Sequence, residues 1–452
     1  MHRSARYALR FTCFAALLTA ISFPARAATL CVAPGGHHNC YSTIQAAVTA
    51  ASAGDVINIW PGTYKEDVTI GKPLSLIGAG WDASVIDATG LADGIFVDGI
   101  DNPGLADVTI AGLTVKNAQF EGVLVVSTSD AVIRDNKILN NDQIGPVFGS
   151  GPACKGQPAF ETDESGDCGG GLHLIGVIHS VISGNTFTGN GDGVLISDET
   201  RMSRDNVLIH NNAVDNPPEC GIVLASHPPV GSVPPAYARH FGVVRNTVAY
   251  NVSARNGVTV GGAGVGLFSD GEGQGMVSGN VIIGNQIIGN GIPGVSLHTH
   301  VGPAFGLPAD DMDGNQIIDN FISGNGADTD DTATPASAGI NINSGGGGSP
   351  VVGTIITGNT IVNEEIGVAA NTPAEVEAHL NTIEGAKTGA ANVCSVDNPT
   401  NPAVCTGSLD VTGNFWGCPK GPGPGGCTMV SGANIVFTPW LTAPLPDFDD
   451  HH

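Results

Sequence analysis

Residues 185–196 read Asn-Thr-Phe-Thr-Gly-Asn-Gly-Asp-Gly-Val-Leu-Ile, and this stretch decides the fold. Two asparagines five residues apart enclose an apolar residue, Phe187, and a glycine with an alternating apolar strand follows them. The asparagine pair recurs at Asn136/Asn141, Asn185/Asn190, Asn211/Asn216, Asn246/Asn251, Asn285/Asn290 and Asn320/Asn325, with a partial copy at Asn359. A repeat of this kind indicates a solenoid.

The glycine after each asparagine pair sets the register of the strand that follows it. Positions one and three after the glycine are apolar, as in Val194 and Ile196, so we expect them to point inward and the intervening positions to point outward. The glycines of the series are Gly122, Gly171, Gly193, Gly221, Gly264, Gly294, Gly339 and Gly367.

Such short strands cannot bury an apolar face alone, but stacked coils pair each strand with its equivalents about 4.8 Å above and below. We therefore predict an all-β chain, a single-stranded right-handed parallel β-helix of about ten coils. The repeated asparagines are interpreted as structural. Asparagine at a turn can adopt the left-handed conformation and hydrogen-bond to the backbone and to the next asparagine in a ladder.

The N-terminus resembles an export signal. Arg3, Arg6 and Arg10 precede an apolar segment too short to span a bilayer, and Ala25-Arg26-Ala27 is a small-residue cleavage site. We expect a secreted or periplasmic protein without membrane insertion. Eight cysteines form close sequence pairs that fit disulfides in an oxidising compartment: Cys31/Cys40, Cys154/Cys168, Cys394/Cys405 and Cys418/Cys427. Cys220 is left over and is predicted to be a buried, inert thiol.

The chain is strongly acidic. Without the four arginines of the leader it has 13 basic and 42 acidic side chains, a net charge near −29. Nucleic acid is therefore not expected as a partner. A polyanionic glycan would also be repelled unless a cation bridges it or basic groups cluster locally.

Both ends of the solenoid need protection. Ser42 and Gln45 form a predicted capping box ahead of a helical apolar stripe that begins at Ile44, and this helix is expected to cover the first coil. The aromatic residues of 414–441 are expected to plug the last coil. The predicted organisation is a signal peptide at 1–27, a cap with the first coils at 28–80, the β-helix at 81–390, and a disulfide-stapled cap and tail at 391–452.

Several stretches resemble the pectin-lyase-like group of right-handed β-helix proteins. They are STIQAAV at 42–48, AGDVI at 53–57, PGTYKE at 61–66 and LSLIGAG at 74–80, together with the closing segment 414–441. The resemblance covers nearly the whole mature chain and implies architecture more than activity. The group includes polysaccharide lyases, galacturonan hydrolases, pectin esterases, uronate epimerases, phage tailspikes and periplasmic accessory proteins of copper enzymes.

The motifs that distinguish these activities are missing from the sequence. Residues 62–66 match the weak GxYxE signature of pectin esterases, but the QDT and DFIFG motifs are absent. The paired aspartates and GHG of galacturonan hydrolases, the DPHD of mannuronan epimerases, and the WIDH and RxPxxR of pectate lyases are absent as well. If the protein is an enzyme, we expect a polysaccharide lyase or a glycoside hydrolase.

An ionisable column is the candidate site. The sixth position after the glycine reads Glu199, His227, Asp270 and His300 in successive coils, about 5 Å apart. His227, Asp270 and His300 are the catalytic candidates, because a histidine flanked by carboxylates suits general acid–base chemistry. The candidates for substrate binding are Asp198, Glu199, His298 and Asn343. The competing interpretation is that these strand ends are polar only because they are exposed to solvent. His173 and His179 are expected at the surface or in turns.

Two acid-rich loops suggest Ca²⁺, with Asp310, Asp311 and Asp313 as the candidate ligands, although acidic loops often only solvate. Arginines 201, 204, 239 and 245 lie in coils next to the column. The leading hypothesis is an exported protein that binds a polysaccharide or cell-surface glycan along the solenoid, with cleavage left open. The alternatives are a non-catalytic binding scaffold and a periplasmic metal-handling accessory protein.

Overall fold

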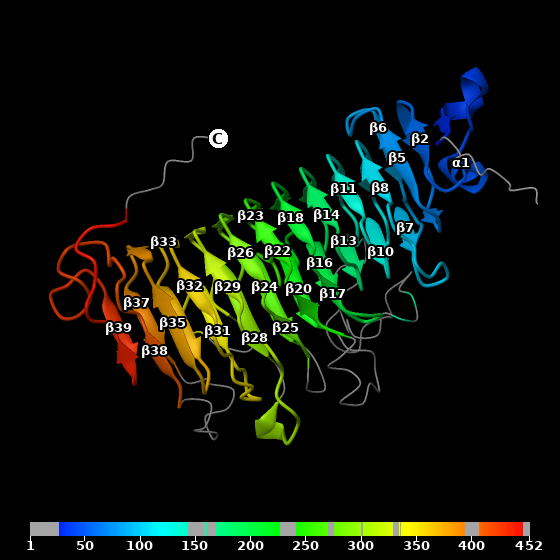
Figure 1. The fold of residues 1–452 in the computed structure, drawn as a ribbon. Coiled ribbons are helices and arrows are strands. Elements are labelled where there is room, and N and C mark those ends of the chain that lie inside the picture. The colour runs from blue at the N-terminus through cyan, green and yellow to red at the C-terminus, as the bar shows by residue number, and fades with distance from the viewer. Residues whose placement is uncertain are drawn as a thin grey trace, which may run out of the picture.

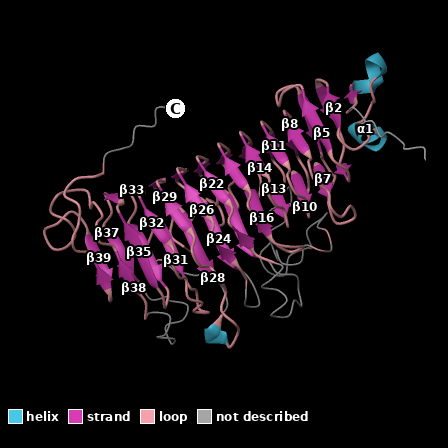
Figure 2. Cartoon of the chain, viewed as in Figure 1, coloured by secondary structure: helices cyan, strands magenta, loops and turns pink. Residues whose placement is uncertain are grey.

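The computed structural model describes residues 27–142, 158, 160, 169–226, 241–269, 275–299, 302–328, 334, 336–393 and 406–445. Figure 1 shows one elongated rod that runs coil by coil from α1 (Ile44–Ala50) at one end to β39 at the other. Strands dominate, and the helices are confined to the N-terminal cap and one short turn (Figure 2). None of the helices in the described ranges has the length and hydrophobicity of a membrane-crossing segment.

Most coils contribute one strand to each of three long parallel sheets. The fourteen-stranded sheet contains β1 (Thr29–Val32), β2 (Asp55–Ile59), β5 (Leu74–Gly78), β8 (Thr109–Ala111), β11 (Val132–Arg134), β14 (Val181–Ser183), β18 (Val207–Ile209), β22 (Thr247–Ala249), β26 (Val281–Ile283), β29 (Gln316–Ile318), β32 (Ile355–Thr357), β35 (Glu375–His379), β38 (Ser408–Asp410) and β40 (Ile435–Val436). The eleven-stranded sheet contains β3 (Gly62–Tyr64), β6 (Ser84–Asp87), β9 (Thr114–Lys116), β12 (Lys137–Leu139), β15 (Thr186–Thr188), β19 (Asn212–Val214), β23 (Val252–Ala254), β27 (Gln286–Ile288), β30 (Phe321–Ser323), β33 (Thr360–Val362) and β36 (Thr382–Glu384).

The twelve-stranded sheet contains β4 (Val68–Ile70), β7 (Ile95–Asp98), β10 (Val123–Val126), β13 (Gly170–Ile175), β16 (Asp192–Ser197), β20 (Ile222–Ser226), β24 (Val265–Ser269), β28 (Val295–Thr299), β31 (Ala338–Asn343), β34 (Ile366–Asn371), β37 (Thr388–Asn392) and β39 (Met429–Gly432). A three-stranded sheet of β17 (Ser203–Arg204), β21 (Val243–Val244) and β25 (Val277–Ser278) lies at one corner. The right-handed parallel β-helix is therefore confirmed, with slightly more turns than predicted.

The glycine register predicted from the sequence is also confirmed. Val123 pairs with Leu172, Leu172 with Val194, and Val194 with Ile222, so the first residue after each glycine forms one inward column. These residues belong to a single apolar core that runs the length of the rod.

The asparagines form buried ladders, as predicted. Asn251, for example, accepts hydrogen bonds at Oδ1 from the backbone N–H and the side-chain Nδ2 of Asn211, at 2.8 and 3.0 Å, and its own Nδ2 donates to Asn285 Oδ1 at 3.0 Å. This first ladder comprises Asn136, Asn185, Asn211, Asn251, Asn285, Asn320, Asn359, Asn381 and Asn414. A second ladder comprises Asn141, Asn190, Asn216, Asn256, Asn290 and Asn325, and ends on Glu364.

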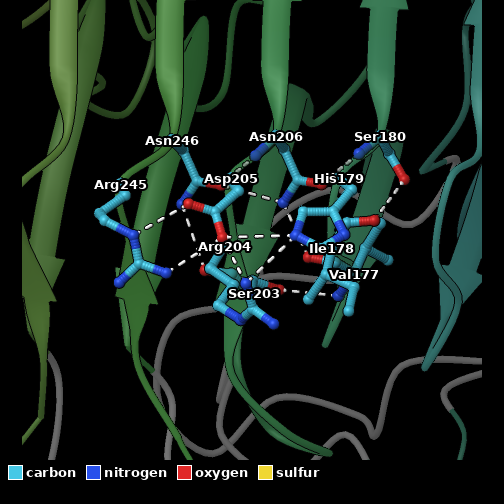
Figure 3. A network of polar contacts seen from close by, with 10 residues as sticks. All are labelled: Val177, Ile178, His179, Ser180, Ser203, Arg204, Asp205, Asn206, Arg245 and Asn246. Atoms are coloured by element: carbon cyan, nitrogen blue, oxygen red, sulfur yellow. Dashed lines mark hydrogen bonds and ion pairs between the residues drawn. The ribbon is translucent and has the colours of Figure 1, made fainter.

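Two features of the ladders differ from the prediction. The left-handed conformation belongs to the residue before the asparagine, such as His210 (φ 56°) or Tyr250 (φ 52°), because the asparagine itself must keep its backbone N–H directed at the next coil. A third ladder also exists at the corner beside β17. Its members are Asn206, Asn246, Asn280 and Asn315, and Figure 3 shows Asn206 and Asn246 with Ser180 on the adjacent coil. The predicted alignment of Asn246/Asn251 with Asn211/Asn216 is therefore wrong, because Asn246 and Asn251 stack on Asn206 and Asn211.

The N-terminal helix covers the first coil as expected, but the predicted capping box is wrong. The helix begins after Thr43, whose hydroxyl accepts from Ala46 N–H at 3.2 Å. The carboxylate of Glu66 accepts the N–H groups of Ile44 and Gln45, so the first turn is capped from another coil rather than by Ser42.

The disulfides Cys31–Cys40 and Cys418–Cys427 are confirmed, and Cys220 is buried and free of a disulfide. The predicted pairs Cys154/Cys168 and Cys394/Cys405 lie outside the described residues. At the C-terminus Trp416 belongs to the main core and Phe437 and Trp440 pack against it, which confirms the aromatic plug.

Candidate functional site

The outer face of the twelve-stranded sheet is distinguished by its burial. The residues two positions after the glycine face outward yet are nearly inaccessible: Leu124, His173, Leu195, Val223, Ser296 and Asn341. On the outside of the fourteen-stranded sheet, by contrast, Val181 and Ile355 are 38% and 45% exposed. Polar groups buried on this outer face must therefore be satisfied within the protein.

A row of hydrogen-bonded ionisable groups crosses the N-terminal half of this face. His173 Nδ1, on β13, lies 3.1 Å from Glu121 Oε1 on the preceding coil. Its Nε2 lies 2.7 Å from Ser197 Oγ at the end of β16, and the Ser197 hydroxyl donates in turn to Glu199 Oε2. All four side chains are buried. We call Glu121, His173, Ser197 and Glu199 the polar row.

The hydrogen-bond directions define where protons lie in the polar row. Because the Ser197 hydroxyl donates to Glu199, His173 Nε2 must carry a proton to donate to Ser197 Oγ. His173 Nδ1 faces Glu121 Oε1, so the imidazole links the two carboxyl groups. The row can thus hold or move a proton between two buried carboxyl groups, which is the capacity that general acid–base catalysis requires.

Two aspartates extend the row toward the N-terminus. Burial, followed by the charges of Glu121 and Asp67, raises the pKa of Asp93 to about 8. Burial also raises the pKa of Asp67. Asp93 Oδ1 accepts the backbone N–H of Glu121 at 3.2 Å. At neutral pH the Asp93 carboxyl is therefore largely protonated and able to donate.

A second polar group occupies the C-terminal half of the face. The His298 ring stacks on Phe268 with centroids 4.3 Å apart, and its Nδ1 lies 3.6 Å from Asp328 Oδ2. Asn341 Nδ2 also donates to Asp328 Oδ2, at 2.9 Å. The apolar cluster of Leu195, Cys220, Val223, Ala225, Ala263 and Ile292 packs with Phe268 and lies between the two polar groups.

The structure buries four of the predicted site residues on strands of this sheet or directly after them. Asp198 Oδ2 accepts from Ser226 Oγ at 3.0 Å, and Glu199 ends the polar row. His298 and Asn343 are register partners on β28 and β31, and Asn343 Oδ1 accepts from Asn371 Nδ2 at 2.7 Å. Asp198 and Glu199 follow β16, three strands from β28, so the two pairs are separate.

The predicted catalytic residues His227, Asp270 and His300 lie outside the described residues, and their role stays a prediction. His179 occupies a turn, with φ 55°, as expected. The expectation for His173 is wrong. Its side chain points outward but is buried between Glu121 and Ser197. Its one sequence signal is an ionisable residue within the otherwise apolar run Leu172–Ile175.

In the acidic loop proposed for Ca²⁺, the carboxylates accept hydrogen bonds from backbone N–H groups. Asp310 Oδ1 accepts from Gly275 N–H at 3.0 Å, and Asp313 Oδ1 accepts from Val352 N–H at 2.9 Å. Asp311 Oδ1 accepts from the N–H of Asp313 at 3.1 Å. Across the described ranges, no group of three or more His, Cys, Asp or Glu side chains is arranged to hold a metal ion. Ca²⁺ binding stays a prediction.

Comparison with known proteins finds the same right-handed β-helix fold in other proteins. The family described as "Right handed beta helix region" matches residues 81–233. The catalytic unit of a thermostable GH87 alpha-1,3-glucanase from Streptomyces thermodiastaticus superimposes with a TM-score of 0.53 at 18% identity, over 82% of this chain and 65% of that one. This chain thus spans just under two thirds of the glucanase unit. A search of curated proteins gave no match.

Two other solved structures show the same fold at low identity. The Dettilon tailspike protein aligns with a TM-score of 0.52 at 14% identity, over 85% of this chain and 68% of the tailspike. A periplasmic alginate epimerase aligns with a TM-score of 0.51 at 13% identity, over 87% of this chain and 77% of the epimerase. Identities this low establish the shared fold alone.

Proposed function

We propose that this right-handed parallel β-helix, which resembles the pectin-lyase-like group, binds a polysaccharide along the outer face of the twelve-stranded sheet and acts on it by acid–base chemistry. The observation that carries this proposal is the polar row. Burying ionised groups is costly, and apolar residues would cover the same face at lower cost. A buried, hydrogen-bonded set of ionisable groups is therefore a strong candidate for function.

The shape of the solenoid suits an extended ligand. Glu121, His173 and Ser197 come from three consecutive coils, so the polar row runs parallel to the axis along which an extended sugar chain would lie. Thr200 and Arg201 are partly exposed where β16 ends, directly after Glu199, so the polar row comes nearest to solvent at this edge of the sheet.

The chemistry of the site suits bond cleavage in a glycan. Glycoside hydrolysis uses one protonated and one ionised carboxyl group. The raised pKa of Asp93 keeps one carboxyl protonated at neutral pH, while Glu121 contacts His173 and Glu199 accepts from Ser197. Lyase chemistry would need a base in the same row. The names of the solved structures, a glucanase, an epimerase and a tailspike, support a carbohydrate ligand.

We expect the polar row to be essential for turnover. The purified chain is incubated with uronate-containing and neutral polysaccharides, with and without Ca²⁺, and products are measured by mass spectrometry. His173→Asn and Glu199→Gln should each lower the rate about a hundredfold, because either change interrupts the proton path. His227→Ala and His300→Ala test the predicted column in the same assay.

The matched control is His210→Asn, because His210 is an exposed corner histidine that stacks on Tyr250 at 5.7 Å, away from the polar row. Its rate should stay at the wild-type level. Melting temperatures show which variants are folded. Unchanged turnover in folded His173→Asn would reject the polar row as the catalytic site. If no glycan binds or raises the melting temperature, the scaffold alternative replaces the proposal.

The proposed location is secreted or periplasmic. The basic, apolar leader and the two disulfides that the structure contains support export, since disulfides persist in oxidising compartments. A metal-handling role gains no support from the described contacts, because His298 is stacked on Phe268 and lies beside Asp328.

A further inference from the structure

The two ends of the solenoid are finished differently. At the N-terminal end, the edge strand of the twelve-stranded sheet is β4, and the Gln45 side chain of α1 binds its backbone. Gln45 Oε1 accepts the N–H of Thr69 at 2.8 Å, and Gln45 Nε2 donates to the Thr69 carbonyl oxygen at 3.3 Å. The amide thus takes the place of a neighbouring strand. Ile44, Ala47 and Val48 of the same helix are buried against the first coil.

The C-terminal end has no comparable cap in the part of the chain that the structure describes. The twelve-stranded sheet ends at β39 and the fourteen-stranded sheet ends at β40, and each of these strands pairs on one side only. The free side of an edge strand presents N–H and C=O groups to which another strand can bind. Three of the four β39 residues are exposed, and Val436 of β40 is 51% exposed, so this end is open to solvent.

The apolar core is also incompletely closed at the C-terminal end. Ala390 and Leu409, which point inward from the preceding strands β37 and β38, are fully buried. Their register partners in the last coil, Val430 and Ile435, pack against the same core but are partly exposed, as is Phe437. Removing this apolar surface from water would be favourable, and contiguous apolar surface of this kind marks an interaction site.

The last coil carries no charge. Between Lys420 and Asp447 the sequence contains no Asp, Glu, Lys, Arg or His, although the net charge of the whole chain is −25. Repulsion between like charges keeps strongly acidic copies of a protein apart. An uncharged end lets two copies approach, and depletion of charged residues is typical of the centre of a protein interface.

From these observations we infer that the C-terminal end is a self-association surface, on which a second copy of this chain docks end to end. Across a twofold axis, β39 of one copy runs antiparallel to β39 of the other, and the two strands form a main-chain ladder. The same contact covers the partly exposed Val430 and Ile435 of both copies. Because Gln45 already binds the N-terminal edge strand, association stops at two copies and forms no filament.

The size of the end indicates a weak, reversible dimer. With its side chains the last coil is roughly 20 Å across, given about 3.3 Å for each strand residue, so each copy covers on the order of 400 Å². Such an area lies in the range of weak, transient complexes. We therefore expect a Kd on the order of 10 μM. The inference does not depend on the proposed function, because the outer face of the twelve-stranded sheet stays free in the dimer.

Sedimentation velocity of the purified protein, from about tenfold below to about tenfold above that Kd, tests the inference. The wild type should shift from monomer to dimer as the concentration rises. Ser431→Glu should raise the Kd at least about tenfold, because the new charges on the two β39 strands meet across the twofold axis. Thr69→Glu is the matched control, since Thr69 is exposed on β4, the opposite edge strand of the same sheet. It should change the Kd less than about twofold.

Small-angle X-ray scattering shows where the two copies meet. An end-to-end dimer should have about twice the maximum dimension of the monomer, whereas a side-by-side pair would be little longer than one rod. A wild type that stays monomeric at the highest concentration, a side-by-side dimer, or assemblies of more than two copies would each overturn the inference. An unchanged Kd in folded Ser431→Glu would overturn it as well. If Ser431→Glu does not melt cooperatively, Val436→Glu on β40 replaces it, with the same expected rise in Kd.

Discussion

Replacing Asn251 by alanine is expected to lower the free energy of unfolding by about 3–5 kcal/mol. The substitution removes the acceptor of two hydrogen bonds from Asn211 and two donor contacts from Nδ2, to Leu208 O and Asn285 Oδ1. The Asn211 N–H and the Leu208 carbonyl would be left buried without partners, and each such group costs about 1–3 kcal/mol. Denaturant unfolding followed by circular dichroism measures the change.

Asn212→Ala is the matched control, since Asn212 is an exposed asparagine one residue beyond the ladder residue Asn211. Its effect should stay within about 0.5 kcal/mol. Similar losses in Asn251→Ala and Asn212→Ala would show that the ladder does not hold the coils together.

The second large effect concerns pH. Asp93→Asn should stabilise the protein at pH 8 and leave its stability near pH 4 unchanged. The Asp93 pKa is about 8 in the folded chain and 3.8 in the absence of the fold, so between these values the folded state binds one more proton than the unfolded state. Wild-type stability contributed by this group therefore falls as pH rises from about 4 to about 8.

The asparagine variant should remove this part of the pH dependence. Its amide oxygen can still accept the Glu121 N–H, and no charge is buried. The gain at pH 8 should be on the order of a few kcal/mol, given about 1.4 kcal/mol for each unit of pKa shift. Melting temperatures of both proteins between pH 4 and pH 9 measure it, with the exposed Asp101→Asn as the control. Parallel curves for wild type and Asp93→Asn would contradict a protonated Asp93.

The repeating parts of the fold follow from the sequence because each depends on local pattern. The glycine before Val194 and the alternation after it set a register that the strand pairs reproduce. The ladder through Asn185 and Asn211 follows from equivalent turns in stacked coils. Contacts between residues of different coils could not be predicted from local sequence pattern. The N-cap contact of Glu66 with Ile44 joins residues 22 apart in the sequence, which no local motif encodes.

The site was less predictable than the fold for the same reason. The glycine register gives the outward direction of His298 and Asn343, which are register partners on β28 and β31, while the binding role of Asp198, Glu199, His298 and Asn343 stays a prediction. Burial on this outer face could not be predicted, since alternation gives the direction of a side chain but does not show whether other segments bury it. The contact between Glu121 and His173 spans 52 residues, and the variable spacing of the coils hides it.

The central claim is that a polysaccharide binds on the outer face of the twelve-stranded sheet. A crystal structure of the protein with an oligosaccharide of the glycan that binds most tightly tests it directly. The account predicts sugar within hydrogen-bond distance of Glu199. Sugar stacked on the exposed Trp60 or Trp81 near the N-terminal end of the rod, with the twelve-stranded sheet unoccupied, would contradict it.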